Sequence, residues 1–180
     1  TWHRRLGDRD NHLEEAKTFY QKVREEEPEH KESIDALEEI YVALDRAEDL
    51  LEIYRGQIDL SPDTDKKIDY LFRTVDLMRD RLEDPEGAIA PAQEALALSP
   101  GHHGAIARLD ELFTKTERWE DLAQTLEDTI RIVAHDQKRV IELKNRLALV
   151  YEKNLERPDT AIEIHASVLA VDPENDNAIE

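Results

Sequence analysis

Cysteine is absent from the sequence. The chain therefore forms no disulfide, holds no metal through thiolates and offers no cysteine nucleophile. A chain without cysteine suits a reducing compartment, so a cytoplasmic location is the expectation. The residues do not specify a location any further.

Glycine, proline and aromatic residues are also scarce. The 180 residues include 5 glycines and 7 prolines, and aromatic residues make up 6%. Such a chain has too few aromatics for a β-sandwich or a large cofactor cavity, while its many straight-chain residues and alanines favour helices. No apolar run reaches the roughly 20 residues of a membrane helix, so we expect no membrane insertion. The composition predicts an all-α protein.

Positive charge is in short supply. Lysine and arginine number 24 against 43 acidic residues, which gives a net charge of −19. A chain this acidic repels phosphate backbones and anionic lipid, so nucleic acid is not an expected partner. A basic or neutral protein or peptide is the partner that the charge allows.

Sequence patterns that carry chemistry are missing as well. There is no glycine-rich phosphate loop and no G-x-S-x-G, and no two histidines stand one helical turn apart. The acidic stretches 59–69 and 172–180 lack the central glycine of a calcium loop. His102 and His103 fall in a predicted surface turn. We therefore expect no enzyme activity, no catalytic residue, no bound metal and no cofactor.

What the chain does contain is an internal repeat. The segment from Pro28 matches the segment from Pro100, and the segment from Leu82 matches that from Leu155. The two shifts along the chain are nearly equal. A large unit has therefore been duplicated.

Each large unit is itself divided in two. A shorter form, such as Pro28 to Pro62, alternates with a longer one, such as Pro62 to Pro100. The extra residues of the longer form fall in the loops around Pro85 and Pro158. Loops of this kind are where a solenoid tolerates insertions, because a packed helix does not accept added length.

Each small unit predicts a pair of helices. Apolar residues recur at i, i+3 and i+7 in the first helix of every unit, which marks one face of a helix. These stripes are Ile34, Leu37, Tyr41; Ile68, Leu71, Val75; Ile106, Leu109, Phe113; and Val140, Leu143, Leu147. The predicted fold is an α-solenoid of stacked antiparallel helix hairpins. Its single array comprises a partial repeat 1–30, full repeats 31–64, 65–102, 103–136 and 137–175, and a repeat start at 176–180.

Prolines and the N-terminal segment lead to three local predictions. Asp84 and Pro85 predict an N-cap followed by the first helical residue. Pro91 would then lie inside that helix, where we expect a kink. Residues 12–27 predict a second helix whose first helix survives only as residues 2–6. Because the sequence starts at Thr1, we expect it to be an excised part of a longer protein.

The period and phase resemble those of the tetratricopeptide repeat (TPR). That family shows W-x2-L-G-x2-Y, then A-x3-F, then P, over about 34 residues. The closing proline is present at Pro28, Pro62, Pro100 and Pro173, whereas the family's glycine is replaced by Glu38, Phe72, Asp110 and Lys144. These larger residues predict wider spacing between helices. The long acidic units are similar to arrays in large bacterial multi-repeat proteins.

The resemblance implies a right-handed superhelix whose first helices line a concave, peptide-binding groove. Positions off the apolar stripes become candidate groove residues: Lys66, Asp69, Arg73, Asp76, Arg108, Glu111, Lys115, Lys138 and Asn145. Some members of the family hold a C-terminal carboxylate with lysine and asparagine. Lys138 with Asn145 is the nearest match, and Lys66 with Arg73 is a second pair. Ordinary solvated helix faces are the other interpretation of these positions.

Two functions remain open from the sequence. The first is a non-catalytic protein–protein interaction scaffold that binds a peptide or partner protein in its groove. The alternative is a structural spacer or self-association module that stacks through its ends, where Tyr20, Val23 and Ile179 would expose apolar surface.

Overall fold

A computed structural model describes residues 2–179 of the chain, with side chains described from residue 11 onward. Within this range the chain forms ten helices and no strand. The helices are α1 (Trp2–Glu26), α2 (Lys31–Ala43), α3 (Ala47–Leu60), α4 (Thr64–Asp80), α5 (Ile89–Leu98), α6 (His103–Lys115), α7 (Trp119–Ile132), α8 (Gln137–Lys153), α9 (Pro158–Leu169) and α10 (Asp176–Ile179).

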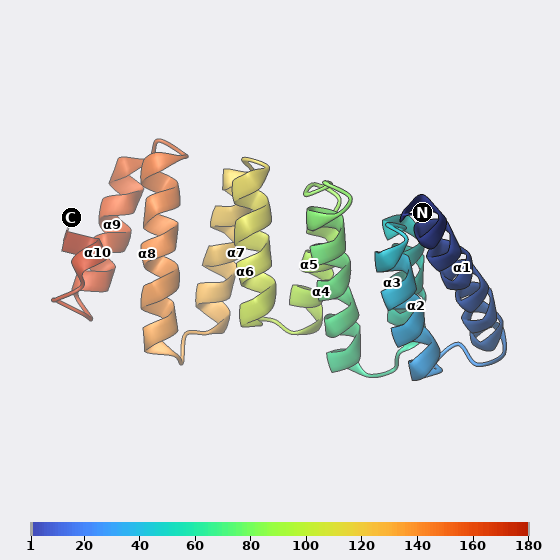
Figure 1. The fold of residues 1–180 in the computed structure, drawn as a ribbon. Coiled ribbons are helices and arrows are strands. Elements are labelled where there is room, and N and C mark those ends of the chain that lie inside the picture. Colours follow the sequence, from blue (N-terminus) through green and yellow to red (C-terminus); the bar gives the residue numbers. More distant parts are fainter. Residues whose placement is uncertain (1, 180) are drawn as a thin grey trace. The chain divides into compact units, whose positions relative to one another are not determined.

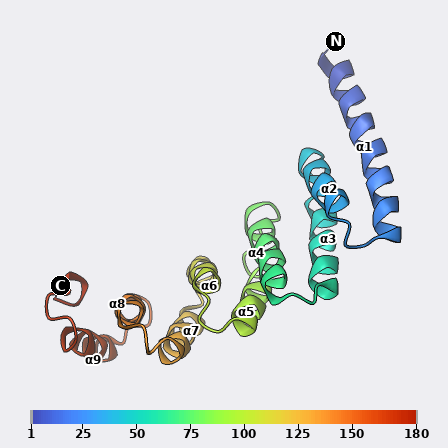
Figure 2. The same ribbon diagram turned by 90° about the horizontal axis from the view of Figure 1, so that it is seen from below.

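The helices belong to two compact units, Thr1–Asp84 and Pro85–Glu180. In the first unit α1 packs on α2, α2 on α3 and α3 on α4. The second unit continues in the same way from α5 to α10 (Figure 1). Figure 2 shows two layers in the second unit, with α6 and α8 in one and α5, α7 and α9 in the other. Each unit is thus a stack of antiparallel helices, as the sequence predicts.

The predicted apolar stripes form most of the core. Leu37, Leu71 and Leu109 are essentially inaccessible to solvent, and so are the second-helix residues Leu122 and Leu126. Each buried leucine contributes about 1.5–3 kcal/mol relative to an exposed one. The fourth stripe is less covered: Leu147 is buried, whereas Val140 and Leu143 are only half-buried. The i, i+3, i+7 spacing therefore identifies the packed face, and neighbouring helices decide how fully it is covered.

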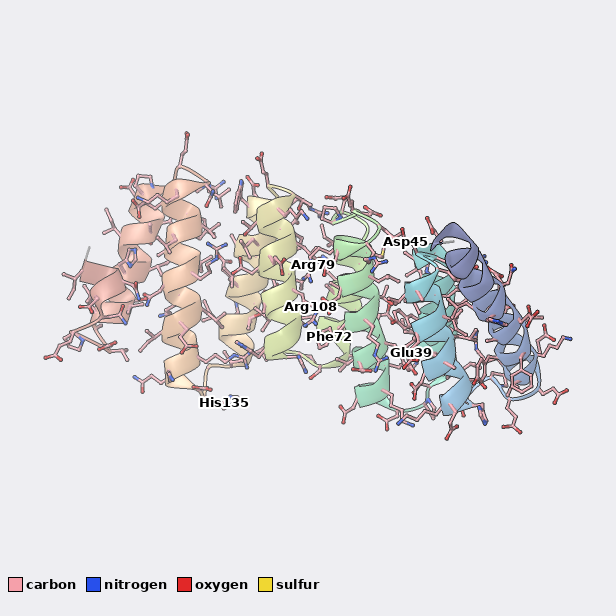
Figure 3. The ribbon with its side chains drawn as sticks, viewed as in Figure 1. Glu39, Asp45, Phe72, Arg79, Arg108 and His135 are labelled. Atoms are coloured by element: carbon pink, nitrogen blue, oxygen red, sulfur yellow. The ribbon has the colours of Figure 1, made fainter. Side chains whose placement is uncertain are left out.

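Two kinds of turn explain the alternating repeat length. The short turns after α2 and α6 place Asp45 and Glu117 at φ 55° and 56°. In each, the next N–H reaches back over the last turn, as in the 2.9 Å bond from Arg118 N to Phe113 O. This is the Schellman arrangement that satisfies terminal helix carbonyls. Asp45 marks the upper edge of its hairpin in Figure 3.

The long turns after α4 and α8 differ from the short turns because their closing backbone hydrogen bonds enclose one more residue. Glu83 and Glu156 have φ of 51° and 53°. The following residues, Asp84 and Arg157, donate N–H bonds of 2.9 and 2.8 Å to the carbonyls of Met78 and Tyr151. The added residues of the long form are therefore held in these turns, where the sequence predicted the insertions to fall.

Two local predictions about prolines need correction. Residues 85–88 form turns and α5 begins at Ile89, so the predicted helix start at Pro85 is wrong. The premise of the predicted kink is also wrong, because Pro91 lies in the first turn of α5 and not inside a helix, so its missing N–H has no intrahelical acceptor to lose. Pro158, by contrast, does start α9.

The N-terminal prediction is also wrong. One continuous helix runs from Trp2 to Glu26 in place of a remnant and a separate second helix. The segment contains no proline, and its leucine, arginine and glutamate residues favour helix. A single glycine at position 7 does not interrupt it.

Candidate functional site

The clearest hollow among the predicted groove residues lies between α6 and α8, within the second unit. It is a shallow depression of about 570 Å³. Its lining comprises Ala107, Asp110, Glu111, Thr114, Lys115 and Arg146. Ala107, Glu111 and Thr114 are exposed, whereas the neighbouring stripe of Ile106, Leu109 and Phe113 is buried. The helical period of α6 thus divides its residues between the core and this depression.

An ion pair between α6 and α8 forms one side of the depression. Arg146 donates from Nε to Asp110 Oδ2 at 2.8 Å and from Nη2 to Asp110 Oδ1 at 2.5 Å. Its Nη2 also reaches the hydroxyl of Thr114 at 2.9 Å. The hydrogen bond with Asp110 raises the pKa of Arg146 against the opposing effect of burial. A two-point pair of this kind fixes the two helices and gives the depression a rigid polar edge.

Lys115 supplies the cation at the open side of the depression. It lies in the last turn of α6, is exposed, and makes no ion pair or side-chain hydrogen bond among the described residues. Glu111 lies one turn earlier on the same helix. The depression therefore offers one free positive charge, one acid, a methyl surface at Ala107 and hydroxyl and guanidinium donors, which together suit a mixed polypeptide segment.

The remaining candidates of the second unit lie apart from this depression. Arg108, which Figure 3 labels on α6, reaches back to the carbonyl of Gly104 at 3.4 Å. Lys138 is exposed and lies 3.9 Å from the carboxylate of Glu142. Asn145 donates to the side chain of Asn175 at 3.1 Å. In this arrangement the proposed carboxylate-binding asparagine is already engaged within the unit.

In the first unit, Arg73 is the centre of a packed cluster. It donates to Asp69 at 2.9 Å and to both carboxylate oxygens of Glu38 at 2.8 and 3.0 Å. Its guanidinium lies 5.4 Å from the centre of the Tyr70 ring. Tyr54, in turn, packs at 5.9 Å from Tyr70. Arg73 therefore links α2 to α4 through its ion pair with Glu38 and stacks on the ring of Tyr70. Its positive charge is thus already paired within the first unit.

Burial controls the protonation of this cluster. Burial raises the pKa of Glu38, and the charge and hydrogen bond of Arg73 offset only part of that effect. Burial and the Glu38 charge raise the pKa of Tyr54 to about 12. For Arg73, burial acts to lower the pKa, but the charges of Glu38 and Asp69 outweigh it and the pKa is raised. The cluster is a partly desolvated ion pair between tyrosines.

The other two candidates of the first unit lie on α4. Lys66 is exposed and makes no ion pair among the described side chains. Asp76 lies 3.3 Å from Arg79. The predicted pair of Lys66 with Arg73 therefore contains one solvated cation and one that is already bound.

Sequence reasoning missed the ion-pair residues Glu38, Asp110 and Arg146. A signal for the acids was present, because Glu38 and Asp110 occupy the family's glycine position. The arginines that bind these acids do not recur at one fixed position of the repeat. Arg73 aligns with Asn145 when the duplicated units are superposed in sequence, so Arg146 stands one position further along its helix.

Histidine residues act here as helix caps. His30 and His102, which align in the duplicated units, accept backbone N–H bonds through Nδ1 from Ser33 at 3.2 Å and Gly104 at 3.1 Å. Each caps the start of a first helix, in the role usually filled by serine or aspartate. His102 thus lies at a helix start within the predicted turn. Across the described residues, no three metal-ligating side chains gather at one point.

None of the helices within residues 2–179 combines the length and apolarity that a bilayer span needs.

Comparison with known proteins identifies the fold. No family model and no curated protein sequence matches the chain. Among solved structures, YrrB, described as a TPR protein with an unusual peptide-binding site, is 15% identical with a TM-score of 0.53, over 97% of this chain and 86% of YrrB. A MamA structure is 20% identical with a TM-score of 0.55, over 95% of this chain and 92% of MamA.

A second MamA structure, from Desulfovibrio magneticus RS-1, is 14% identical with a TM-score of 0.52, over 96% of this chain and 94% of that one. The chain therefore has the all-α, helical-repeat solenoid fold found in TPR proteins. At these identities the likeness concerns the fold alone.

Proposed function

We propose that the chain is a non-catalytic interaction scaffold that binds a peptide or an extended segment of a partner protein between α6 and α8. The depression at Ala107 and Lys115 is the observation that carries this proposal. It is open, shallow and rigidly edged, which suits a polypeptide rather than a small molecule enclosed on most sides. The peptide-binding description of YrrB agrees with such a role.

The arrangement of charge defines the expected ligand. Glu111 and Lys115 lie on the same helix at the edge of the depression, and the Asp110–Arg146 pair is internally neutral. A neutral or mixed segment with a small apolar side chain against Ala107 and a carboxylate near Lys115 would complement these groups. Because the whole chain carries a charge of −19, a strongly acidic partner is disfavoured.

A peptide-array screen of the purified chain, followed by calorimetric titration of the strongest binders, tests this function. We expect Ala107→Arg, which fills the depression, and Lys115→Glu, which reverses its free charge, each to weaken binding by about tenfold or more. Arg131→Glu on α7 is the matched control, since Arg131 pairs with Asp128 on its own helix. It should leave affinity unchanged.

The proposed function has a definite contrary outcome. Peptide binding that survives both Ala107→Arg and Lys115→Glu, or that is lost in the Arg131→Glu control, would place the ligand on another surface. A chain that binds no peptide in the array would also contradict the proposal.

A further inference from the structure

A hollow is found at matching positions of α1 in the first unit and α5 in the second. The hollow of the first unit is lined by Gln21, Arg24 and Glu25. The hollow of the second unit measures about 340 Å³ and lies between α5 and α7, which Figure 2 shows in one layer. Its lining includes Gln93, Leu96 and Ala97, which align with those three residues when the duplicated units are superposed in sequence. The two hollows are therefore copies of one feature.

In the first unit, an arginine side chain reaches from α1 to α3 at this place. A Cβ added to Gly56 on α3 would lie 3.7 Å from Nη2 of Arg24, so the guanidinium packs beside that glycine. The Nε of Arg24 is buried and has no hydrogen-bond partner among the described residues. The duplicated framework thus accepts a guanidinium on its alkyl stem between these two helices.

The second unit has the opposite chemistry at the same two positions. Leu96 replaces Arg24, and Asp128 replaces Gly56. Leu96 is half-buried, and Ala97 beside it is exposed. The hollow between α5 and α7 therefore combines an apolar wall with a carboxylate, and no lysine or arginine is among the described residues that line it.

A shorter side chain on α7 also leaves a backbone acceptor without its donor. In the first unit, Gln57 donates from Nε2 to the carbonyl of Pro28 at 2.9 Å. Its counterpart Thr129 donates instead to the carbonyl of Thr125 on its own helix, at 2.7 Å. Pro100, the counterpart of Pro28, lines the hollow and lacks that side-chain donor.

Asp128 has capacity for a further donor. It accepts bonds from Arg131 at 2.8 Å and from Gln124 at 3.0 Å, one on each carboxylate oxygen. A carboxylate has about four acceptor sites, so each oxygen can take another bond. The side chain is half-exposed. Because α5 and α7 together carry five acidic residues and one basic residue, the surrounding charge favours a cationic ligand.

We propose that the hollow between α5 and α7 docks a basic segment of a partner polypeptide through one inserted arginine side chain. The stem of this arginine lies against Leu96 and Ala97, and its guanidinium pairs with Asp128. Arginine fits better than lysine because its planar fork has five donors, which serve both the carboxylate and the carbonyl of Pro100. The hollow lies in the other layer of the second unit from the depression between α6 and α8 (Figure 2), so the two sites are separate.

Nuclear magnetic resonance titration of the isotope-labelled chain with an arginine peptide tests the proposal. The probe is the acetylated and amidated peptide Gly-Ser-Arg-Ala-Lys-Gly, compared with the same peptide carrying citrulline in place of arginine. We expect saturable shifts of the amides of residues 93–100 and 124–132. Citrulline keeps the shape of arginine without its charge, so it should weaken binding by about tenfold or more. Equal binding of the two peptides would overturn the proposal.

Variants of the chain test the contacts inside the hollow. Asp128→Asn should weaken binding of the arginine peptide by about tenfold. Glu120→Gln is the matched control, since it removes an exposed acid from the other end of the same helix and should leave binding unchanged. Equal effects of these two variants would indicate diffuse attraction to an acidic chain and would overturn the proposal.

A third variant supplies the arginine from the chain itself. Leu96→Arg restores the residue type of Arg24, so it should occupy the hollow and abolish the shifts. Circular dichroism checks that the variant is folded, and the comparison of Asp128→Asn with Glu120→Gln decides the matter if it is not. Unchanged peptide binding in folded Leu96→Arg would contradict the proposed place of the arginine.

Other occupants of the hollow give different results. Tighter binding of a peptide with leucine in place of arginine would overturn the charge pairing in favour of an apolar side chain. Concentration-dependent sedimentation abolished by Leu96→Arg would instead make the occupant a second copy of the chain. Ala107→Arg, which fills the depression between α6 and α8, should not affect the arginine peptide, so this test is independent of the proposed function.

Discussion

The two compact units are built from one duplicated plan but use their exposed first-helix faces differently. Each retains a histidine cap, an arginine before a second helix and an acid at the position of Glu38 or Asp110. In the first unit, Arg73 fills the space beside that acid and stacks on Tyr70. In the second, Arg146 binds the acid and a depression remains beside the pair.

A shift of one position in the arginine accounts for much of this difference. Arg73 sits where the second unit has Asn145, and Arg146 sits where the first unit has the buried Thr74. The same acid can thus be neutralised from two adjacent positions on the next first helix. The duplication therefore preserves the ion pair between the two first helices. The position of its arginine decides which neighbouring side chains remain available to a ligand.

Equivalent core leucines give the strongest test of whether the two units are independently stable. Leu37→Ala and Leu109→Ala remove fully buried side chains at matching positions. Each should lower the free energy of unfolding by about 2–5 kcal/mol, from lost burial and the cavity left behind. Hydrogen exchange should show Leu37→Ala weakening mainly α2–α4 and Leu109→Ala mainly α6–α8.

The comparison would fail if either leucine variant lowered protection evenly across both units. The chain would then unfold as one cooperative block. The double variant supplies a further check, because effects in separately folding parts should add.

At alkaline pH, Tyr54 should make the first unit lose stability relative to the second. Its pKa of about 12 in the folded chain exceeds the ordinary tyrosine value of about 10, so the folded state keeps a proton that the unfolded state loses. Stability contributed by this group is complete below pH 10 and is lost as pH rises towards 12. The second unit has Leu126 at the matching position.

Denaturant unfolding between pH 9 and 11, combined with hydrogen exchange, measures this effect. We expect the first unit to lose about 1 kcal/mol by pH 11. Burial also raises the pKa of the neighbouring Tyr70, so Tyr54→Phe should remove only the part of that loss that belongs to Tyr54. Leu126→Phe should leave the pH dependence unchanged. An equal alkaline loss in Tyr54→Phe would assign the effect to another group.

The fold was predictable from the sequence because its information is local and periodic. Spacing of i, i+3 and i+7 identifies Leu37, Leu71 and Leu109 as core residues without any knowledge of their partners. The length alternation likewise places the insertions in the turns near Pro85 and Pro158. The start of α5 was missed because Pro91 fits a first helical turn as well as it predicts a kink, and only the neighbouring backbone decides between them.

The candidate site was predictable in part. Off-stripe spacing selected Glu111 and Lys115, which the structure places on the depression. It also selected Arg73 and Asn145, which bind other residues of their own unit. Partners separated by about one repeat, such as Asp110 and Arg146, depend on the register between packed helices. A single sequence has no local signal for that register.

The short turns provide the smallest test of the two-unit comparison. Asp45 and Glu117 hold the same left-handed conformation, which costs a residue with a Cβ about 1 kcal/mol. Glu117→Gly should therefore stabilise the chain by about 0.5–1 kcal/mol, less the greater entropy of glycine when unfolded. Asp45→Gly should gain less, because Asp45 also accepts a 2.7 Å bond from Arg81. Thermal unfolding of the two variants and of Asp45→Gly with Arg81→Ala measures the difference. If Asp45→Gly raises the stability as much as Glu117→Gly does, the Asp45–Arg81 pair contributes nothing, as is common for exposed ion pairs. The two turns would then be energetically equivalent despite their different surroundings.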